Sequence, residues 1–291
     1  MMVIAVLVSF ANAQGDGLGQ QLAGGKIITG ATAQRLIHFT FDDGPDPRTT
    51  VRLLDTLDRL QIKVTFFFSA SRFRKGKARN RHAAEIAREA LRRGHSIGSH
   101  SVDHQRMARL SPNALTEQLD ENERLFEAVF GTRTFLFRPP FGSSNHHLDQ
   151  MLLKRRYTNV LWNIGLADWV KRPPKAILKT FEKVLARNET QDGQRGGVVL
   201  LHDTHAWSVD AVELLVGHLQ QRNCELLAQD QSLYDIVDDL SPFFQEASQN
   251  EAGVEAAMAR IPDHALQRRQ QALVDEARRR CAGEGSLQAA P

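Results

Sequence analysis

No stretch of eighteen consecutive apolar residues occurs in this 291-residue chain, so the sequence contains no candidate membrane-spanning helix. An excess of one charge is also missing, because 37 basic and 34 acidic residues give a net charge of only +3. Such a balance argues against a strong role in binding nucleic acids or membrane surfaces. Hydrophobic residues make up 42% of the chain and charged residues 24%, which is typical of a globular protein with one large domain or two small ones.

Cysteine is scarce, with only Cys224 and Cys281 in the chain. They either form one disulfide in an oxidising compartment or remain two separate thiols. At the other end, residues 3–10 are apolar and are followed by Ala11-Asn12-Ala13, a spacing of small residues that resembles a signal-peptidase site. We therefore predict a signal peptide over residues 1–13 and a secreted or periplasmic, cell-envelope location. The alternative is an ordinary buried N-terminal segment, since no basic residue precedes the apolar run.

Strand-like and helix-like patterns alternate through the middle of the chain. The expected strands cover residues 36–41, 63–69, 96–100, 134–137, 158–164, 197–201 and 225–228. The expected helices cover residues 49–60, 78–93, 114–129, 174–187 and 209–222. This alternation predicts a parallel α/β architecture, closed or nearly closed into a barrel. In such barrels the chemistry lies at the C-terminal ends of the strands.

The segments on either side of this alternation have a different character. Residues 14–33 are rich in Gly, Gln and Ala and are expected to form a flexible lead-in to a domain that covers residues 34–240. Residues 241–291 lack strand patterns and are expected to form a helical C-terminal extension, with two helices interrupted near Pro262.

Two adjacent carboxylates, Asp42 and Asp43, stand where the first expected strand gives way to Gly44-Pro45. Glycine and proline favour turns, so these residues in isolation indicate a solvated turn. Histidine and arginine residues at later expected strand ends allow a second interpretation, in which the two carboxylates belong to a catalytic site.

The sequence His100-Ser101-Val102-Asp103-His104 places two imidazoles four residues apart, after another expected strand. Histidine is a common zinc ligand, although pairs of surface histidines are also common. With a carboxylate from the first strand end, the set becomes two His and one Asp. That set leaves a coordination position open, as catalytic metal sites do.

The sequence Arg138-Pro139-Pro140-Phe141-Gly142 closes a further expected strand. The prolines stiffen the backbone, so the N–H of Phe141 is a candidate oxyanion donor. Arg138 could lower the pKa of a nearby carboxylate. The alternative is a rigid loop with a surface arginine.

His202 follows the apolar run over residues 198–201. At a strand end that faces a metal site it is a candidate general acid, and otherwise it is a buried core residue.

Taken together, the motifs T-F-D-D-G-P, H-S-x-x-H, R-P-P-F-G and L-L-H-D, in this order, resemble the NodB-type polysaccharide deacetylases of carbohydrate esterase family 4. The resemblance runs from about residue 35 to 240. It implies a distorted (β/α)7 barrel that removes N-acetyl or O-acetyl groups from a polysaccharide such as peptidoglycan or a chitin-like polymer. It also implies a divalent metal, zinc first, with cobalt, nickel or manganese as alternatives.

The resemblance implies a role for each matching residue. Asp42 resembles the catalytic base, and His202 resembles the catalytic acid. Arg138 resembles the residue that orients the base, and Phe141 stands where the family has tyrosine. The implied metal ligands are Asp43, His100 and His104, and the implied substrate or oxyanion residues are Phe141, Pro140, Trp169, Asp168 and Leu200.

The fourth motif departs from the family pattern. Gly165 and Asn163 replace two acidic residues, whereas Asp168 and Trp169 are kept. Arg138 therefore either lacks its usual acidic partner or uses Asp168. Trp169 either lines the acetyl pocket or the sugar groove, or it packs in the core. The altered motif keeps two other functions open, a catalytically weakened glycan-binding barrel and an amidase that acts on non-sugar C–N bonds.

Basic residues crowd the loop after the second expected strand, and they indicate either attraction to an anionic glycan or a solvated loop. They are Arg72, Arg74, Lys75, Lys77, Arg79 and Arg81.

Overall fold

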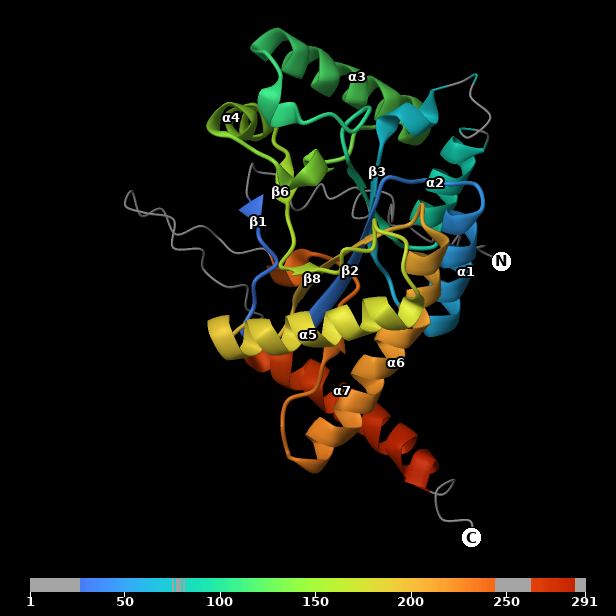
Figure 1. The fold of residues 1–291 in the computed structure, drawn as a ribbon, viewed down its shortest axis with the longest axis vertical. Helices are drawn as coiled ribbons and strands as arrows, with labels where there is room; N and C mark the ends of the chain where they lie inside the picture. The colour runs from blue at the N-terminus through green and yellow to red at the C-terminus, as the bar shows by residue number, and fades with distance from the viewer. Residues whose placement is uncertain (1–26, 75, 77–79, 81, 244–262, 286–291) are drawn as a thin grey trace, which may run out of the picture.

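A computed structural model of the chain describes residues 27–74, 76, 80, 82–243 and 263–285. The strands are β1 (Ile27–Ile28), β2 (Leu36–Asp42), β3 (Thr65–Phe68), β4 (Ser96–Ser99), β5 (Leu136–Phe137), β6 (Thr158–Val160), β7 (Ile164–Gly165), β8 (Gly197–His202) and β9 (Asp235–Ile236). They form one sheet in the order β1-β6-β5-β4-β3-β2-β8-β7, with β9 added on β2. Every strand pairing is parallel, and the sheet curls into a half-barrel, which confirms the predicted distorted (β/α)7 architecture (Figure 1).

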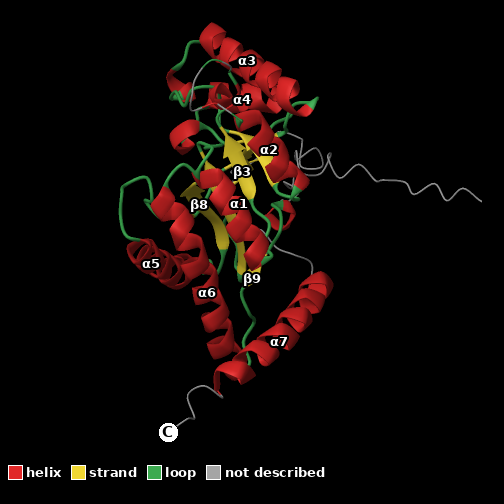
Figure 2. Cartoon of the chain, turned by 90° about the vertical axis from the view of Figure 1, so that its right-hand side faces the viewer, coloured by secondary structure: helices red, strands yellow, loops and turns green. Residues whose placement is uncertain are grey.

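Seven α-helices accompany the sheet in the described part of the chain. They are α1 (Thr49–Leu60), α2 (Ala83–Arg92), α3 (Pro112–Phe130), α4 (His146–Lys154), α5 (Pro174–Asp192), α6 (Ala206–Ala228) and α7 (Asp263–Gly285). Helices α3 and α4 lie at one end of the molecule and α7 at the other (Figure 2). No helix in the described residues is long and apolar enough to cross a membrane.

The central strands are buried on both faces. Every residue of β2, β3 and β8 is buried, as expected for parallel strands that are covered on both sides. Successive side chains point to opposite faces of a strand. Phe39 and Phe41 of β2 accordingly belong to the large cluster shared with the helices, whereas Leu36 belongs to a second cluster with Phe67. Asp42 lies an even number of residues from Leu36 and therefore shares its face.

The start and end of α3 follow the sequence signals. Ser111 caps the helix by accepting a hydrogen bond from the Ala114 N–H at 3.4 Å, and Pro112 occupies the first turn. Gly131 ends the helix with φ of 75°, a left-handed conformation that glycine adopts without strain.

Two strand predictions are wrong. Residues 225–228 belong to α6, because Leu226 continues the buried face of that helix and is only 2% exposed. The additional strand on β2 is β9, which lies further along the chain. The predicted strand over residues 158–164 is divided into β6, which lies next to the edge strand β1, and β7, which forms the opposite edge of the sheet.

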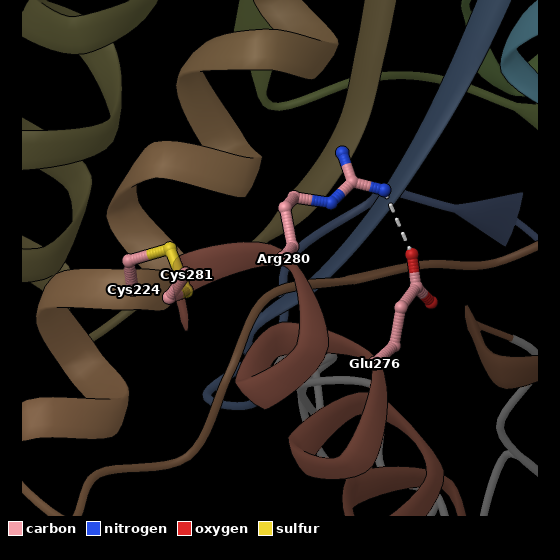
Figure 3. Close-up of a disulfide and its surroundings, with 4 residues drawn as sticks. All are labelled: Cys224, Glu276, Arg280 and Cys281. Atoms are coloured by element: carbon pink, nitrogen blue, oxygen red, sulfur yellow. Dashed lines mark hydrogen bonds and ion pairs between the residues drawn. A yellow bond between two sulfur atoms is a disulfide. The ribbon is translucent and has the colours of Figure 1, made fainter. Parts of the chain in front are cut away.

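Helix α7 is attached covalently to the domain. A disulfide joins Cys224 of α6 to Cys281 of α7, which resolves the question that the sequence left open (Figure 3). Gln270 of α7 exchanges two hydrogen bonds with the backbone of Leu233, at 2.7 and 3.0 Å. Arg269 pairs with Asp235 of β9, at 2.9 Å for the Nη2–Oδ1 contact. The described part of the C-terminal extension is therefore fastened to α6 and to the segment around β9.

The predicted signal peptide over residues 1–13 and most of the predicted lead-in lie outside the described residues. Residues 27–28, within the expected lead-in, form β1 and pair with β6. The first of the two helices expected in the C-terminal extension also falls outside the described residues. The domain boundaries at residues 34 and 240 remain predictions.

Candidate active site

The predicted site residues lie at the C-terminal ends of neighbouring parallel strands. Asp42 ends β2, and His202 ends β8 at the register position opposite Asp42. His100 directly follows β4, and Arg138 directly follows β5, next to it in the sheet. Because these strands are parallel, their C-terminal ends form one rim, and the four side chains converge there.

Asp43, His100 and His104 form a compact group of potential metal ligands, with one ligand atom from each residue within 4.8 Å of the others. The Oδ1 atom of Asp43 lies 3.7 Å from Nε2 of His100 and 3.5 Å from Nε2 of His104. One carboxylate and two imidazoles make up a donor set that suits zinc or another divalent transition metal. These three residues therefore fit the implied metal.

The surroundings of His100 prepare it for this role. Its Nδ1 atom lies 2.7 Å from the carbonyl oxygen of Arg138, so Nδ1–H donates there and Nε2 is left as the acceptor. Burial lowers the pKa of His100 to about 3, against an opposing effect of the Asp43 charge. The imidazole is therefore neutral at physiological pH, as a metal ligand must be.

The backbone at this group is unusual. Asp43 and His104 have positive φ angles of 80° and 61°. Non-glycine residues rarely adopt this region, and such conformations concentrate at functional sites. The turn after β2 and the turn after β4 therefore both hold a potential ligand in a conformation with an energetic cost.

Asp42 and Arg138 form a buried ion pair beside these ligands. The Nη1 atom of Arg138 donates to Asp42 Oδ1 at 2.7 Å and to Thr40 Oγ1 at 2.8 Å, while Nε donates to the carbonyl of Val160 at 2.8 Å. Asp42 is 2% exposed and Arg138 is fully buried. Burial raises the pKa of Asp42 above its ordinary value, and the Arg138 charge opposes this rise.

Aromatic rings surround Arg138 where the family pattern has an acid. The guanidinium carbon of Arg138 lies 4.1 Å from the centroid of the Phe67 ring and 5.4 Å from that of Trp162. A Cβ atom on Gly165 would lie 3.2 Å from Nε1 of Trp162. Asp42 is the carboxylate that pairs with Arg138 among the described residues. The suggestion that Arg138 uses Asp168 is not supported, because Asp168 bonds elsewhere.

Asp168 is committed to His202. Its Oδ1 atom lies 2.9 Å from Nδ1 of His202, and its Oδ2 atom accepts the His202 backbone N–H at 2.8 Å. Ser208 also donates to Oδ2, at 2.6 Å, and the Trp207 indole N–H donates to the Asp168 carbonyl at 2.7 Å. Burial alone would lower the pKa of His202, but the hydrogen bond and charge of Asp168 outweigh it and raise the pKa to about 9. His202 is therefore protonated at neutral pH.

Two exposed aromatic side chains flank the group. Phe141 is 51% exposed, and its ring centroid lies 4.5 Å from that of His104. Trp169 is 56% exposed, and its ring lies edge-on to His202 at 6.2 Å. Trp169 is therefore not a core residue. Pro140 and Leu200 are buried, and Leu200 shares the strand face of His202 two residues later.

Sequence reasoning missed Asp203 as a supporting residue. It is fully buried and accepts a hydrogen bond from Thr50 at 2.5 Å, and burial raises its pKa to about 7. A Cβ atom on Gly44 would lie 2.0 Å from its Oδ2 atom, so the turn that carries Asp43 fits against Asp203 only because residue 44 is glycine. Its place beside His202 in the L-L-H-D motif was the available signal.

The basic loop after β3 is partly described. Arg72 donates from Nε to the carbonyl oxygen of Asp43 at 3.2 Å, and Arg74 pairs with Glu121 at 3.5 Å. Lys75, Lys77, Arg79 and Arg81 lie outside the described residues. At least one of the predicted basic residues therefore stands against the potential metal group.

The family model described as polysaccharide deacetylase matches residues 29–160. The peptidoglycan-N-acetylmuramic acid deacetylase PdaC of Bacillus subtilis is 30% identical over 194 residues, which cover 67% of this chain and 38% of that protein. The chain thus spans less than half the length of the first curated relatives it matches.

Solved structures of polysaccharide deacetylases also resemble this chain. The structure of PdaC from Bacillus subtilis is 30% identical, with a TM-score of 0.53 over 65% of this chain and 85% of that one. The chitin deacetylase from the fungal pathogen Colletotrichum lindemuthianum shares the fold, with a TM-score of 0.60 over 68% of this chain and 87% of that one, at 24% identity. The chain therefore belongs to the polysaccharide deacetylase family, carbohydrate esterase family 4, whose members hydrolyse N-acetyl amide bonds.

Proposed function

We propose that this protein is a metal-dependent hydrolase that removes N-acetyl groups from an acetylated polysaccharide of the cell envelope. The observation that carries the proposal is the position of Asp42 between two partners. One of its carboxylate oxygens binds Arg138 at 2.7 Å, and the other lies 3.7 Å from Nε2 of His100, beside the potential metal ligands. A base next to a metal site and opposite a protonated histidine suits amide hydrolysis.

Asp43, His100 and His104 would hold the metal, with zinc as the first candidate and cobalt, nickel or manganese as alternatives. A divalent cation at such a site supplies Lewis acidity and makes a water molecule more acidic. The geometry around His100 supports this assignment, because its Nδ1–H is bound to the Arg138 carbonyl and its Nε2 faces Asp43.

Asp42 acts as the general base, which takes a proton from the attacking water. Its burial raises its pKa and so its basicity, while the charge of Arg138 opposes that rise and favours the ionised form. Arg138 is itself fixed by the Thr40 hydroxyl and the Val160 carbonyl, so it holds the carboxylate in one orientation.

His202 acts as the general acid. Hydrolysis of an amide expels an amine, which leaves poorly unless it is protonated. The pKa of about 9 keeps the proton on His202 at neutral pH, and Asp168 at Nδ1 leaves Nε2 free to face the substrate nitrogen. This arrangement parallels the role that a buried aspartate plays for a catalytic histidine in hydrolytic triads.

The remaining predicted residues shape the binding site. The Phe141 N–H is the proposed oxyanion donor, and the buried residues Pro140 and Leu200 are the proposed neighbours of the substrate beside Phe141 and His202. Phe141 and Trp169 offer exposed aromatic faces on which sugar rings can pack, which accounts for two large hydrophobic groups left in contact with water.

The disulfide supports the proposed location. Disulfides form and persist in oxidising compartments such as the periplasm and the extracellular space. The Cys224–Cys281 bond is therefore consistent with an exported protein, as a polysaccharide substrate of the envelope requires.

Acetate release tests the proposal. The purified protein, loaded with zinc, should release acetate from N-acetylglucosamine oligomers or from peptidoglycan, and Asp42→Asn should abolish the release. A protein that binds these glycans and releases no more acetate than Asp42→Asn would be a glycan-binding barrel. Release from non-sugar acetamides alone would indicate the amidase.

A further inference from the structure

A cation stands beside the potential metal group without an acidic partner. Arg106 is exposed, and its guanidinium carbon lies 4.1 Å from the centroid of the Phe141 ring. The same ring contacts His104, a potential metal ligand, at 4.5 Å between centroids. Within the described residues no carboxylate forms an ion pair with Arg106. Arg74, by contrast, is paired with Glu121 at 3.5 Å.

The backbone that carries Arg106 is held firmly. Arg106 precedes the short 3-10 helix Met107–Arg109, and Met107 is only 1% exposed, in a cluster with Leu148 of α4. The Asn145 side chain also donates to the carbonyl of Ala108 at 2.7 Å. The guanidinium is thus presented from an anchored segment, and stacking on Phe141 restricts its orientation further.

A stacked arginine suits one kind of ligand. Its planar guanidinium keeps its hydrogen-bond donors free at the edge, where they match the two oxygens of a carboxylate. Restricting the side chain before binding lowers the entropic cost of that contact. Arg72, which donates to the Asp43 carbonyl, adds a second positive charge near the same group.

We propose that Arg106 is a specificity-determining residue that binds a carboxylate carried by the substrate close to the acetamide under attack. The preferred substrate is therefore an acidic N-acetylated glycan, with the carboxylate on the same sugar or on its neighbour. This inference rests on the proposed deacetylase function, and it specifies in addition that the preferred substrate is negatively charged.

The test compares substrates that differ only in that charge. The first pair is an oligosaccharide of N-acetylglucosamine and N-acetylmuramic acid and the same oligosaccharide with its lactyl carboxylates converted to methylamides. The second pair is an N-acetylhexosamine–uronic acid oligosaccharide and its carboxyl-methylamide. The two pairs distinguish a lactyl carboxylate from a ring carboxylate as the group that is recognised.

The measured quantity is the ratio of kcat/KM for the acidic substrate to that for its amide. In the unmodified protein this ratio should exceed one for at least one pair. Arg106→Gln should lower it about tenfold, mainly through KM, as expected for a hydrogen-bonded ion pair worth about 1.4 kcal/mol. Arg106→Lys keeps the positive charge and loses the planar pair of hydrogen-bond donors, so its ratio should lie between those of the unmodified protein and Arg106→Gln. Raised salt should reduce the preference of the unmodified protein.

Arg109→Gln is the matched control, since Arg109 is an exposed arginine at the other end of the same 3-10 helix. It removes the same charge and should leave the ratio unaltered. An equal ratio in the unmodified protein and Arg106→Gln would overturn the inference while acetate release still upheld the proposed function.

Binding provides a readout that does not depend on turnover. In an Asp42→Asn background, calorimetry should find tighter binding of the acidic oligosaccharide than of its amide, and Arg106→Gln should remove the difference. Equal affinities for the two would overturn the inference whether or not the protein releases acetate.

Discussion

Asp168 holds His202 with both of its carboxylate oxygens, one at the ring Nδ1 atom and one at the backbone N–H, 2.9 and 2.8 Å away. The aspartate thereby fixes the position of the strand end as well as the orientation and charge of the ring. Ser208, at the start of α6, completes the arrangement by donating to the oxygen that binds the backbone.

Replacing Asp168 by Asn should impair the proposed acid. Burial would then dominate and lower the pKa of His202, so the ring would lose its proton near neutral pH. We expect kcat on an amide substrate to fall about 100-fold, the lower range of what general acid catalysis contributes. The alkaline limb of the pH profile, which follows deprotonation of His202, should move to lower pH.

Ser208→Ala is the control for this prediction, because it removes one hydrogen bond to Asp168 and keeps the carboxylate. Its alkaline limb should stay close to that of the unmodified protein. An Asp168→Asn variant with an unshifted alkaline limb would show that His202 is not the group that titrates there.

Replacing Arg138 by Met should affect both activity and stability. Without the guanidinium, burial raises the pKa of Asp42 further, so the acid limb of kcat/KM should move to higher pH. The loss of one partner from a buried pair should also lower the free energy of unfolding by about 3–5 kcal/mol. The measurements are a pH–rate profile and denaturant unfolding, with the exposed Arg124→Met as a control for loss of an arginine. An unchanged acid limb would contradict the role of Arg138.

Replacing His104 by Ala should weaken metal binding. The loss of a ligand should raise the dissociation constant for zinc by more than about 100-fold, since the loss of an outer hydrogen-bond partner alone costs 10–100-fold. Competition with a chelator, followed by metal analysis, measures this constant. His82→Ala removes an exposed histidine bonded to Glu85 and should leave it unchanged. Full retention of zinc by His104→Ala would refute the proposed ligand set.

Replacing Cys224 and Cys281 by Ser should destabilise the protein without changing its chemistry. The bond spans 57 residues, and a loop of that length implies a stabilisation of about 4 kcal/mol in the chain-entropy model. Thermal unfolding of the double variant should match that of the unmodified protein in the presence of reductant. A double variant with unaltered stability would mean that the packing of α7 on α6 suffices.

The sequence predicted which side chains converge and not how they are connected. Asp42, His100, Arg138 and His202 could be assigned to one site because each ends or follows an apolar strand pattern, and parallel strands share a rim. The pairing of Asp168 with His202 could not be predicted in this way. Asp168 lies on an irregular loop, where the spacing of residues does not indicate the direction in which a side chain points. The sequence therefore suggested Arg138, and not His202, as its partner.

The remaining misses have similar causes. Leu226 and Leu227 fit a strand as well as a helix over so short a run, and only the continuation of α6 decides between them. The stack of Arg106 on Phe141 joins two loops 35 positions apart and leaves no periodic signal. The pairing of the cysteines depended on where α7 lies, which its weakly apolar sequence did not indicate.

Strand β2 has hydrogen-bonded neighbours at three places: Ile37 lies opposite Ile236 of β9, Thr40 opposite Thr65 of β3, and Asp42 opposite His202 of β8. Slippage of β2 by a single residue would exchange its two faces. Phe41 would then point toward the candidate active site, and Asp42 would point toward the helices. Three partners must yield together before that can happen. Helix α7 holds the segment around β9 in place through an ion pair and hydrogen bonds. By pairing with the start of β2, this segment helps to fix the register of the strand that ends at Asp42.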